Sequence, residues 1–501
     1  MTSRADVCLI LEGTYPYVAG GVSSWVHDLI KAQSDLKFHL LTLMPDAKPK
    51  PFKYELPSNV TGQTMVGLQD LRRGEGRLGG LSGLLRGLEP ALLDLQSKGG
   101  MAQLSAVMRA LSAAPREKLG SRALLNSTEA FDLLCRMYEK TVRQTSFLDY
   151  FWTWRALLGG LYATLLCPLP EAAVYHAVST GYAGLVAARA KIVTRRPLLL
   201  TEHGIYTNER RIEIAMADWL FQESSTFAIE KARRDLRDLW IDTFVSYSRA
   251  CYEAADRIIT LYGGNQVLQR RDGAPEEKLE IIVNGIDYAK YAATPRDAAP
   301  RPPAIALIGR VVPIKDIKTY IRAAAILRES VPDVVAYVLG PTEEDPEYFA
   351  ECRAMVEHLG LEKTVVFAGR VALGDYLGKL DAIVLTSISE AQPLVILEAG
   401  AAGVPCVATD VGACREMLYG RPDEVPPLGA GGAVTPLADP TATAKALAQI
   451  LSDPATFAAC SRAIRERVRL HYNKIEIDRI YGALYRRSID APDGAPLAKA
   501  A

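Results

Sequence analysis

Short apolar runs separated by longer amphipathic stretches dominate the hydrophobic pattern of this chain. Most runs are followed by a segment whose apolar residues recur at helical spacing. Strands that alternate with helices of this length favour a parallel, doubly wound sheet, so we predict an α/β protein with two such domains. The runs of strand length are residues 7–12, 38–44, 172–176, 197–201 and 255–261, and then 304–309, 334–340, 365–369, 382–386 and 405–409.

Two segments interrupt this alternation and divide the chain. Residues 291–303 are rich in alanine, proline and charge and lack periodicity, which is typical of a linker. We therefore predict a first domain over residues 1–296, a second over 297–470, and a closing helix with a tail over 471–501. Within the first domain, leucine-rich and glycine-broken segments predict a helical insertion over residues 62–169.

Composition and charge exclude several classes of protein. Lysine plus arginine and aspartate plus glutamate both number 58, so nothing favours a polyanion surface, and we expect no nucleic-acid partner. The eight cysteines are scattered, which favours reduced thiols and no metal site. The first apolar run ends at Glu12, too early for a signal peptide, and residues 156–170 are shorter than the ~20 that a membrane helix needs. We expect a cytoplasmic protein.

The strongest candidate for chemistry is the strand, loop and helix within residues 381–402. Glu390 falls in the loop, Gln392 and Pro393 suit a first helical turn, and Glu398 follows inside the helix. N–H groups at a helix start bind anions. Two carboxylates that accept hydroxyl hydrogen bonds, beside amides that bind phosphate, suit a nucleotide sugar. Two glutamates at this spacing are, however, a weak signal on their own.

Basic residues follow the first strand of the second domain. Arg310 and Lys315 stand at the carboxyl end of that strand, where ligands bind in doubly wound sheets. Arginine grips phosphate through two N–H groups and lysine acts as a point charge. As isolated residues they would be ordinary surface charges.

Three features of the first domain are ambiguous by themselves. Gly20 and Gly21 form a loop before a helix, which suits either a phosphate contact or a simple tight turn. His176 and His203 each end a strand, and a lone histidine is often structural; the glycine after His203 favours a site there. The charged run of residues 209–211 is expected to be a solvated helix face.

Taken in order, these motifs resemble the GT4-type retaining glycosyltransferases. The resemblance rests on Gly20-Gly21, His203, the N-G-I-D motif of residues 284–287, Arg310 with Lys315, and Glu390 with Glu398. It implies the GT-B fold, in which two Rossmann-like domains face a cleft and the second binds the nucleotide sugar. The glycine usual after the lysine is Asp316 here, which leaves the local loop shape open.

The resemblance also implies a role for each residue. Glu390, Arg310, Lys315 and His203 would be catalytic, and Glu398 would bind ribose. The two cations would stabilise the departing diphosphate, with no metal ion and no cofactor. The implied donor-binding residues are Gly20, Gly21, Arg310, Lys315, Glu390, Ala391, Gln392, Pro393, Leu394 and Glu398.

The segments LILEGTYPYVAGGVSSWVHDLI and TEHGIYTNER are similar to the cytoplasmic glycosyltransferases of bacterial Pel exopolysaccharide synthesis in biofilms. This implies a UDP-glucose or UDP-N-acetylhexosamine donor, a polysaccharide acceptor, and docking on an inner-membrane polysaccharide synthase complex. Two alternatives stay open. A nucleotide-sugar epimerase shares the two-domain build, and a non-catalytic sensor would bind the nucleotide sugar and leave it intact.

Overall fold

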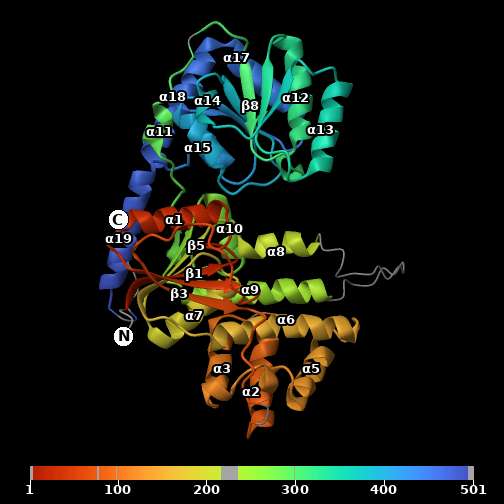
Figure 1. Ribbon diagram of the computed structural model, residues 1–501, viewed down its shortest axis with the longest axis vertical. Helices are drawn as coiled ribbons and strands as arrows, with labels where there is room; N and C mark the ends of the chain where they lie inside the picture. The colour runs from red at the N-terminus through yellow and green to blue at the C-terminus, as the bar shows by residue number, and fades with distance from the viewer. Residues whose placement is uncertain are drawn as a thin grey trace. The chain divides into compact units, whose positions relative to one another are not determined.

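The computed structural model describes residues 4–75, 78–97, 99–215, 235–297, 299–492 and 494, and it omits the side chains of residues 213–215. Contacts divide the chain into two compact units (Figure 1). The first unit comprises Met1–Thr260, Asn265–Ile281 and Ile480–Ala501, and the second comprises Leu261–Gly264 and Ile282–Arg479. Each unit is described below by itself.

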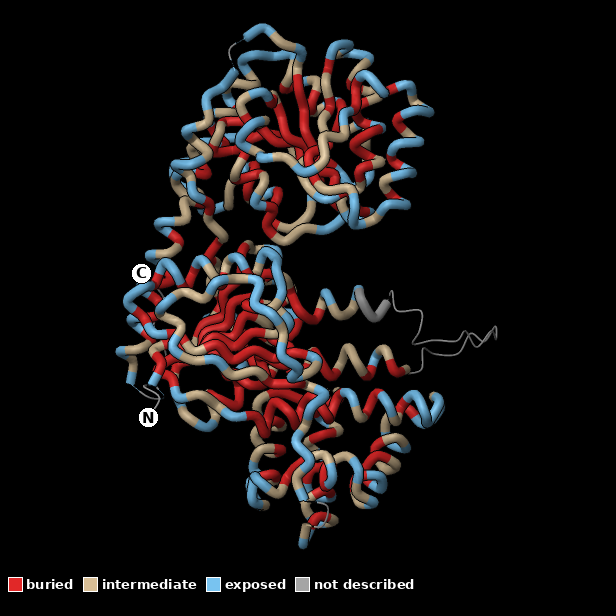
Figure 2. The backbone as a smooth tube through the Cα atoms, viewed as in Figure 1, coloured by how far each residue is buried: buried red, intermediate tan, exposed pale blue. Residues whose placement is uncertain are grey.

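The first unit is built on a seven-stranded sheet in which every neighbouring pair is parallel. The strand order is β3-β2-β1-β4-β5-β6-β7, so the direction of winding reverses between β1 and β4. The central strands are buried on both faces, as Figure 2 shows in red. The strands are β1 (Ala5–Glu12), β2 (Phe38–Met44), β3 (Val60–Gly67), β4 (Ala172–Ala177), β5 (Leu198–Glu202), β6 (Arg257–Thr260) and β7 (Leu279–Ile281).

The helical insertion begins later than the sequence pattern predicts. Residues 60–67, of which the last six fall inside the predicted insertion, form the edge strand β3. Most of β3 is only partly buried, so its polar residues conceal the apolar signal of a strand. The helices that follow are α2 (Leu81–Leu95), α3 (Met101–Leu111), α4 (Ser121–Leu124), α5 (Thr128–Thr141) and α6 (Phe147–Leu166), with the 3-10 turn η1 (Arg116–Lys118).

Helix α6 joins the insertion to the sheet. It lies between the sheet and the group formed by α2, α3 and α5 (Figure 1). Its second half is buried almost all round, from Leu157 to Leu166, which explains why this stretch is so apolar without spanning a membrane. No helix in the described part of the chain is long and apolar enough to cross a bilayer.

The remaining helices of this unit flank the sheet. The sequence of residues 206–251 is also typical of a helical region, and residues 216–234 of that stretch lie outside the described residues. The helices are α1 (Gly21–Ala32), α7 (Tyr182–Thr194), α8 (Tyr206–Ala215), α9 (Leu236–Ala254) and α10 (Gly263–Arg271), with the 3-10 turn η3 (Glu276–Lys278).

The second unit has a six-stranded parallel sheet in the order β10-β9-β8-β11-β12-β13, so winding reverses between β8 and β11. The strands are β8 (Ala304–Ile308), β9 (Val335–Leu339), β10 (Val365–Gly369), β11 (Ala382–Leu385), β12 (Cys406–Thr409) and β13 (Gly432–Thr435). The helices are α11 (Tyr288–Ala292), α12 (Ile317–Ser330), α13 (Pro346–His358), α14 (Gly374–Leu377), α15 (Leu394–Ala401), α16 (Cys414–Tyr419), α17 (Pro440–Ser452) and α18 (Pro454–His471), with the turn η4 (Pro313–Lys315). The last helix, α19 (Lys474–Asp490), belongs to this unit up to Arg479 and to the first unit from Ile480.

The contacts group two segments differently from the predicted domains. Residues 282–296 belong with the second unit, because Ile286 pairs with Asn473 in an isolated β-bridge. Residues 480–501 belong with the first unit, since the Tyr485 hydroxyl lies 2.7 Å from Nδ1 of the buried His176. Residues 493 and 495–501 of the expected tail lie outside the described residues.

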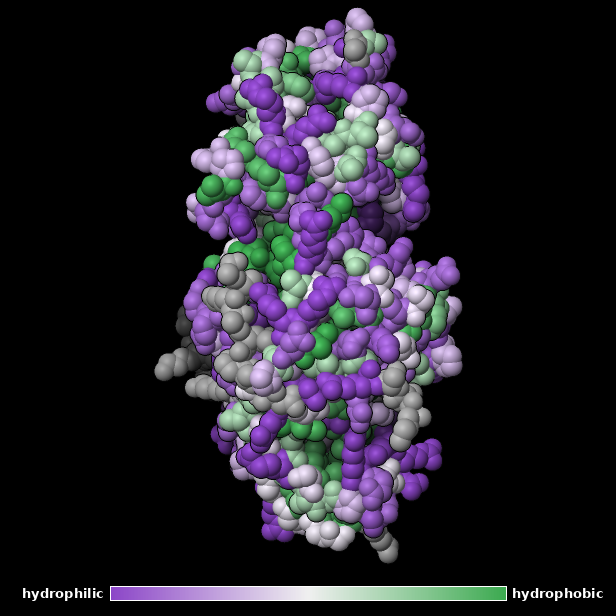
Figure 3. All heavy atoms as spheres, turned by 90° about the vertical axis from the view of Figure 1, so that its left-hand side faces the viewer, coloured by the Kyte–Doolittle hydropathy of each residue, from purple (hydrophilic) through white to green (hydrophobic). Residues whose placement is uncertain are grey.

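The surface of each unit is mostly polar on the face shown in Figure 3, where hydrophobic residues appear in smaller groups. Many of the ion pairs join exposed side chains, and exposed ion pairs add little stability. The stability of the fold therefore depends on the buried sheets and on the polar contacts inside them.

We expect Tyr485→Phe to lower the free energy of unfolding by about 1–3 kcal/mol, because it leaves a buried ring nitrogen of His176 without a partner. Chemical denaturation of the purified chain measures this change. Tyr419→Phe is the matched control. Its hydroxyl accepts a hydrogen bond from the Val434 amide at 2.9 Å, but its side chain is 41% exposed, so water can replace the bond. Equal losses in the two variants would contradict the assignment of His176 as a structural residue.

Candidate functional site

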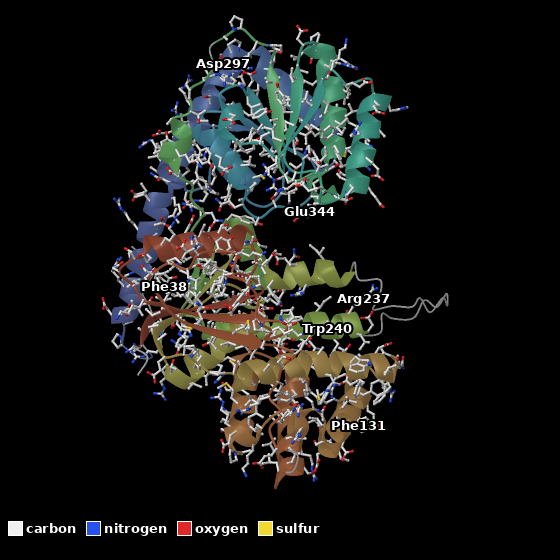
Figure 4. The ribbon with its side chains drawn as sticks, in the orientation of Figure 1. Phe38, Phe131, Arg237, Trp240, Asp297 and Glu344 are labelled. Carbon is white, nitrogen blue, oxygen red and sulfur yellow. The ribbon has the colours of Figure 1, made fainter. Side chains whose placement is uncertain are left out.

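A short loop after β8 carries Arg310 and Lys315, the two cations that the sequence predicts to bind the diphosphate. Arg310 pairs with Glu344 at 2.5 Å, and both side chains are about half exposed (Figure 4 labels Glu344). Lys315 forms an ion pair with Glu390, and here both partners are largely buried, at 20% and 14% exposure. The loop therefore holds one exposed cation and one shielded cation, and only the second is in contact with a predicted carboxylate.

Asp316 takes the backbone conformation that the usual glycine would supply. Its φ of 45° and ψ of 56° lie in the left-handed region, which aspartate tolerates better than most residues. Its side chain then accepts a hydrogen bond from the Thr319 amide and caps α12. The departure from the resembled motif thus preserves the turn after Lys315.

The loop that carries Glu390 is held by its neighbours. The amide of Ile388 donates to the Ile314 carbonyl at 2.9 Å, and Thr386 Oγ1 donates to the carbonyls of Lys315 and Asp316. On the other side, a Cβ at Gly412 would come within 2.3 Å of the Glu390 carbonyl oxygen. The fold therefore fixes the position of Glu390 against Lys315 from both sides.

Helix α15 begins directly after this loop and has no side-chain cap. The N–H groups of a first helical turn have no partner within the helix, and they carry the positive end of the helix dipole. An anion that approaches Lys315 from the side of Glu390 would therefore meet backbone donors at the turn from β11 to α15. Residues 391–394 lead into and begin this helix, and their contact with a donor stays a prediction.

Two further side chains that are predicted to bind the donor form hydrogen bonds within the protein. The Gln392 side chain accepts from the Asn284 amide at 2.9 Å and donates to the Asn284 carbonyl at 3.0 Å, so it positions the N-G-I-D turn. Glu398, inside α15, accepts a hydrogen bond from the Tyr291 hydroxyl at 2.9 Å. Burial and the Glu398 carboxylate raise the pKa of Tyr291, so this hydroxyl stays a donor at neutral pH.

The positions of these groups follow from the strand order. The cation loop follows β8 and the Glu390 loop follows β11, and these are the two strands between which winding reverses. At such a point the flanking connections diverge to opposite faces of the sheet, and the gap left at the carboxyl ends is where ligands bind. The second unit thus brings Lys315, Glu390 and the start of α15 together at its switch point.

The first unit has a cavity of about 790 Å³ at its own switch point. The loops after β1, β4 and β5 line it, together with residues of α6, α7, α8 and α9. His203 lines this cavity next to the loop residues. Gly20 and Gly21 do not line it; they are exposed at the uncapped start of α1, with no atom in contact distance of an added Cβ.

Several buried polar atoms in the cavity lining have no hydrogen-bond partner among the described residues. They belong to Thr14, Ser179, His203 and Trp240, and both ring nitrogens of His203 are among them. A buried polar atom without a partner costs about 1–3 kcal/mol, so this concentration indicates a place for a polar ligand. Burial lowers the pKa of His203 to about 4, so the ring is neutral near pH 7 and can both donate and accept.

His176 has a different environment from His203. Its Nδ1 lies 2.7 Å from the Tyr485 hydroxyl and its Nε2 lies 2.9 Å from Thr201 Oγ1. Burial lowers the pKa of His176 to about 3. It is a structural residue of the first unit's core.

Two buried carboxylates beside the cavity were not singled out from the sequence. Glu12, at the end of β1, accepts from the Tyr206 hydroxyl at 2.8 Å and from the Ala183 amide at 3.0 Å; burial raises its pKa. Glu202, just before His203, accepts from Thr180, Tyr252 and Gln269, and burial raises its pKa to about 7. Glu12 could have been singled out from the sequence, because it is a carboxylate at the end of an apolar run.

The sequence predicts a solvated helix face for residues 209–211, which agrees with the exposed Glu209 but not with the partly buried Arg210 and Arg211. Glu209 and Arg210 line the cavity, and the Arg210 guanidinium lies 4.9 Å from the centre of the Tyr206 ring. Arg211 makes a long ion pair, of 3.4 Å, with the buried Asp272. The run lies beside the cavity because α8 begins immediately after the loop of His203.

No group of three or more histidine, cysteine, aspartate or glutamate side chains in the described part of the chain is arranged to hold a metal ion. The free cysteines are mostly buried, and burial raises the pKa of the Cys414 thiol to about 12. The candidate chemistry therefore depends on carboxylates, cations, backbone amides and His203.

Two segments of this chain match the models of known protein families. Residues 5–277 match the model of a domain of unknown function, DUF3492, over slightly more than half of the chain. The chain belongs to this family. Residues 295–467 of this chain match the model of glycosyl transferases group 1. This second segment contains Arg310, Lys315, Glu390 and Glu398.

Curated relatives share only part of the DUF3492 chain. The D-inositol 3-phosphate glycosyltransferase of Kribbella flavida is 31% identical over 232 residues, which cover 43% of this chain and 50% of that protein. The enzyme of the same name from Kineococcus radiotolerans is 32% identical, with 40% and 51% covered. The chain spans about half the length of the curated relatives it matches.

Solved structures share the fold over nearly the whole chain. The alignment with sucrose-phosphate synthase from Thermosynechococcus elongatus covers 96% of this chain and 98% of that protein, with a TM-score of 0.57 and 20% identity. Anabaena HepE in complex with UDP covers 96% and 99%, with a TM-score of 0.58 and 16% identity. The two doubly wound domains are those of the GT-B glycosyltransferase fold.

We expect Glu202→Gln to flatten the pH dependence of stability. The folded pKa of about 7 lies above the ordinary value of 4.5, so the folded state holds this proton more tightly. The stability from this group is complete below about pH 4.5 and is lost as the pH rises through about 7. The unfolding midpoint of the wild type, taken relative to that of Glu202→Gln, should therefore fall between about pH 5 and about pH 8.

Thermal melts of both proteins across this range measure the difference. The buried histidines titrate in both proteins, so their contributions cancel. A difference that stays constant with pH would show that Glu202 is ionised throughout.

Proposed function

We propose that this protein is a retaining glycosyltransferase that uses a UDP-sugar donor, UDP-glucose or a UDP-N-acetylhexosamine, to build a bacterial exopolysaccharide. The observation that carries the proposal is the switch point of the second unit, where Lys315, Glu390 and the uncapped start of α15 converge. A diphosphate needs cations and amide donors together, and a sugar needs carboxylates. The loops after β8 and β11 supply all three at this switch point.

The comparisons support the class of reaction and of donor. The segment that carries these residues matches glycosyl transferases group 1, and the curated relatives are named as glycosyltransferases. Solved structures of the same fold hold UDP or UDP-glucose. These findings favour a transferase over the epimerase and the sensor.

In the proposed mechanism, the bond between the sugar's anomeric carbon and the diphosphate breaks, and its electron pair goes to the phosphate oxygen. Lys315, Arg310 and the amides of α15 stabilise the charge that grows there. The acceptor hydroxyl attacks from the same face and gives its proton to the departing phosphate, which retains the anomeric configuration. No protein nucleophile and no metal ion enters this step.

The remaining residues act by holding the donor. Glu398, oriented by the Tyr291 hydroxyl, is assigned to the ribose hydroxyls, and Glu390 to the sugar. His203, neutral and with both ring nitrogens unpartnered, is assigned to a hydroxyl of the donor sugar. Catalysis then consists mainly of positioning and electrostatic stabilisation.

The product and the partners form the finer part of the proposal. We assign the polymer to the Pel type, because the N-terminal segment and the segment around His203 resemble the Pel glycosyltransferase PelF. That assignment implies that the protein works in the cytoplasm, docked on an inner-membrane polysaccharide synthase complex through protein contacts.

We expect Lys315→Ala to lower acceptor-dependent release of UDP by roughly 100-fold or more, because the leaving group loses its shielded cation. The assay follows UDP release from each member of a donor panel, with a chelator present. Lys318→Ala is the matched control, since its ammonium pairs with Glu351 on the outer side of α12. Turnover that ceases with the chelator alone would contradict the metal-free mechanism. A UDP-sugar that binds and remains intact would favour the sensor.

We expect Glu390→Gln to tighten the binding of free UDP by roughly threefold to tenfold while turnover falls. Glu390 neutralises Lys315 in the free protein, so an incoming diphosphate must replace this largely buried pair. Calorimetry with UDP measures the affinity. Glu344→Gln is the control, because its pair with Arg310 is exposed and screened, so the change should stay below about twofold. Weaker UDP binding in Glu390→Gln would show that the carboxylate supports the nucleotide directly.

A further inference from the structure

The cavity of the first unit has an aromatic wall that the loops of the sheet do not provide. Trp240 and Phe244 project from α9 and stack with their ring centres 5.8 Å apart and their planes 22° from parallel. Tyr182 and Tyr206 continue this wall from α7 and α8. Trp240 lies between α9 and α6 (Figure 4).

Two glycines make room for this wall. A Cβ at Gly160 would come within 2.5 Å of the Tyr182 ring, and a Cβ at Gly181 would come within 2.3 Å of the Tyr206 ring. Gly160 belongs to α6, so the inserted helix is shaped to admit an aromatic ring at the cavity. The insertion therefore contributes to the cavity as well as to the core.

Polar atoms accompany the rings. The Trp240 Nε1, Thr14 Oγ1 and Ser179 Oγ atoms are buried and have no partner among the described residues. Sugar rings present C–H groups on their faces and hydroxyls at their edges. Aromatic rings with a few hydrogen-bonding groups around them suit such a ligand.

The charges of the cavity lining do not suit an anionic ligand. Its described ionisable residues are Glu12, Glu209 and Arg210, besides the neutral His203 and the tyrosines. Whether Glu12 is protonated or ionised, the described residues of the lining carry no net positive charge. The Arg210 guanidinium, moreover, lies over the rings of Tyr206 and Phe244 at 4.9 and 5.8 Å.

We propose that this cavity binds the acceptor, that the acceptor is an uncharged saccharide, and that its terminal sugar stacks on Trp240. The inference rests on the proposed transferase function and specifies the substrate class of that reaction. It separates this protein from the curated relatives, whose name states an acceptor that carries phosphate. Trp240 is thereby a specificity-determining residue that contacts the substrate.

The test measures binding of acceptor candidates to the full chain by saturation-transfer NMR and by titration of tryptophan fluorescence. The probes are uncharged oligosaccharides of glucose and of N-acetylglucosamine, with D-inositol 3-phosphate as the anionic competitor. We expect at least one oligosaccharide to bind, Trp240→Ala to weaken it at least tenfold, and Trp240→Phe to weaken it less. Trp152→Ala is the matched control, since this α6 tryptophan is 61% exposed and does not line the cavity.

Each outcome decides the proposal. Preferred binding of D-inositol 3-phosphate, binding of no oligosaccharide, or equal losses in Trp240→Ala and Trp152→Ala would overturn it. Titration of the same variants with UDP keeps the two proposals separate, because the residues assigned to the nucleotide lie in the second unit. Saccharide binding lost in Trp240→Ala, in a chain that does not bind UDP, would support the cavity assignment while overturning the donor assignment.

Discussion

Parallel strands place all their carboxyl ends at one edge of a sheet, and the function proposed for this protein depends on that constraint. In each unit the chain starts in the middle of the sheet, winds outward one way, and then returns to wind the other way. The connections on the two sides of the return leave in opposite directions, and they open a gap that side chains from distant parts of the sequence share. Lys315 and Glu390, separated by 75 residues, meet at such a gap.

The meeting of these two residues gives the site a balanced charge before any ligand arrives. A shielded lysine alone would pay a desolvation cost, and the carboxylate offsets it. Under the proposed function, this pairing would make binding an exchange, in which a diphosphate takes the place of the Glu390 carboxylate and the carboxylate becomes available to sugar hydroxyls. Arg310, paired at the exposed surface with Glu344, contributes charge at a smaller cost because water screens that pair.

The first unit uses the same topology differently. Part of its cavity lining comes from α6 and α9, which are additions to the basic alternation of strands and helices. Gly160 of α6 allows the Tyr182 ring of α7 to approach, and α9 contributes the rings of Trp240 and Phe244. Among the described residues, buried polar atoms without hydrogen-bond partners occur in this cavity on Thr14, Ser179, His203 and Trp240. A family that keeps a common donor chemistry can thus acquire a particular acceptor through elements inserted around one cavity.

The sequence by itself determined the local elements and the order of the charged motifs, because buried parallel strands are continuous apolar runs and helices repeat at their own spacing. Ten strands were predicted in this way, whereas the partly exposed β3 and the short β7 and β13 carry too weak a pattern. Only the tertiary structure decided which polar residues are engaged and which are left for a ligand. His176 and Gln392 are satisfied by Tyr485 and Asn284, whereas the ring nitrogens of His203 have no hydrogen-bond partner among the described residues. Those contacts join residues 108 and 309 positions apart, and no local pattern of the chain encodes such a distance.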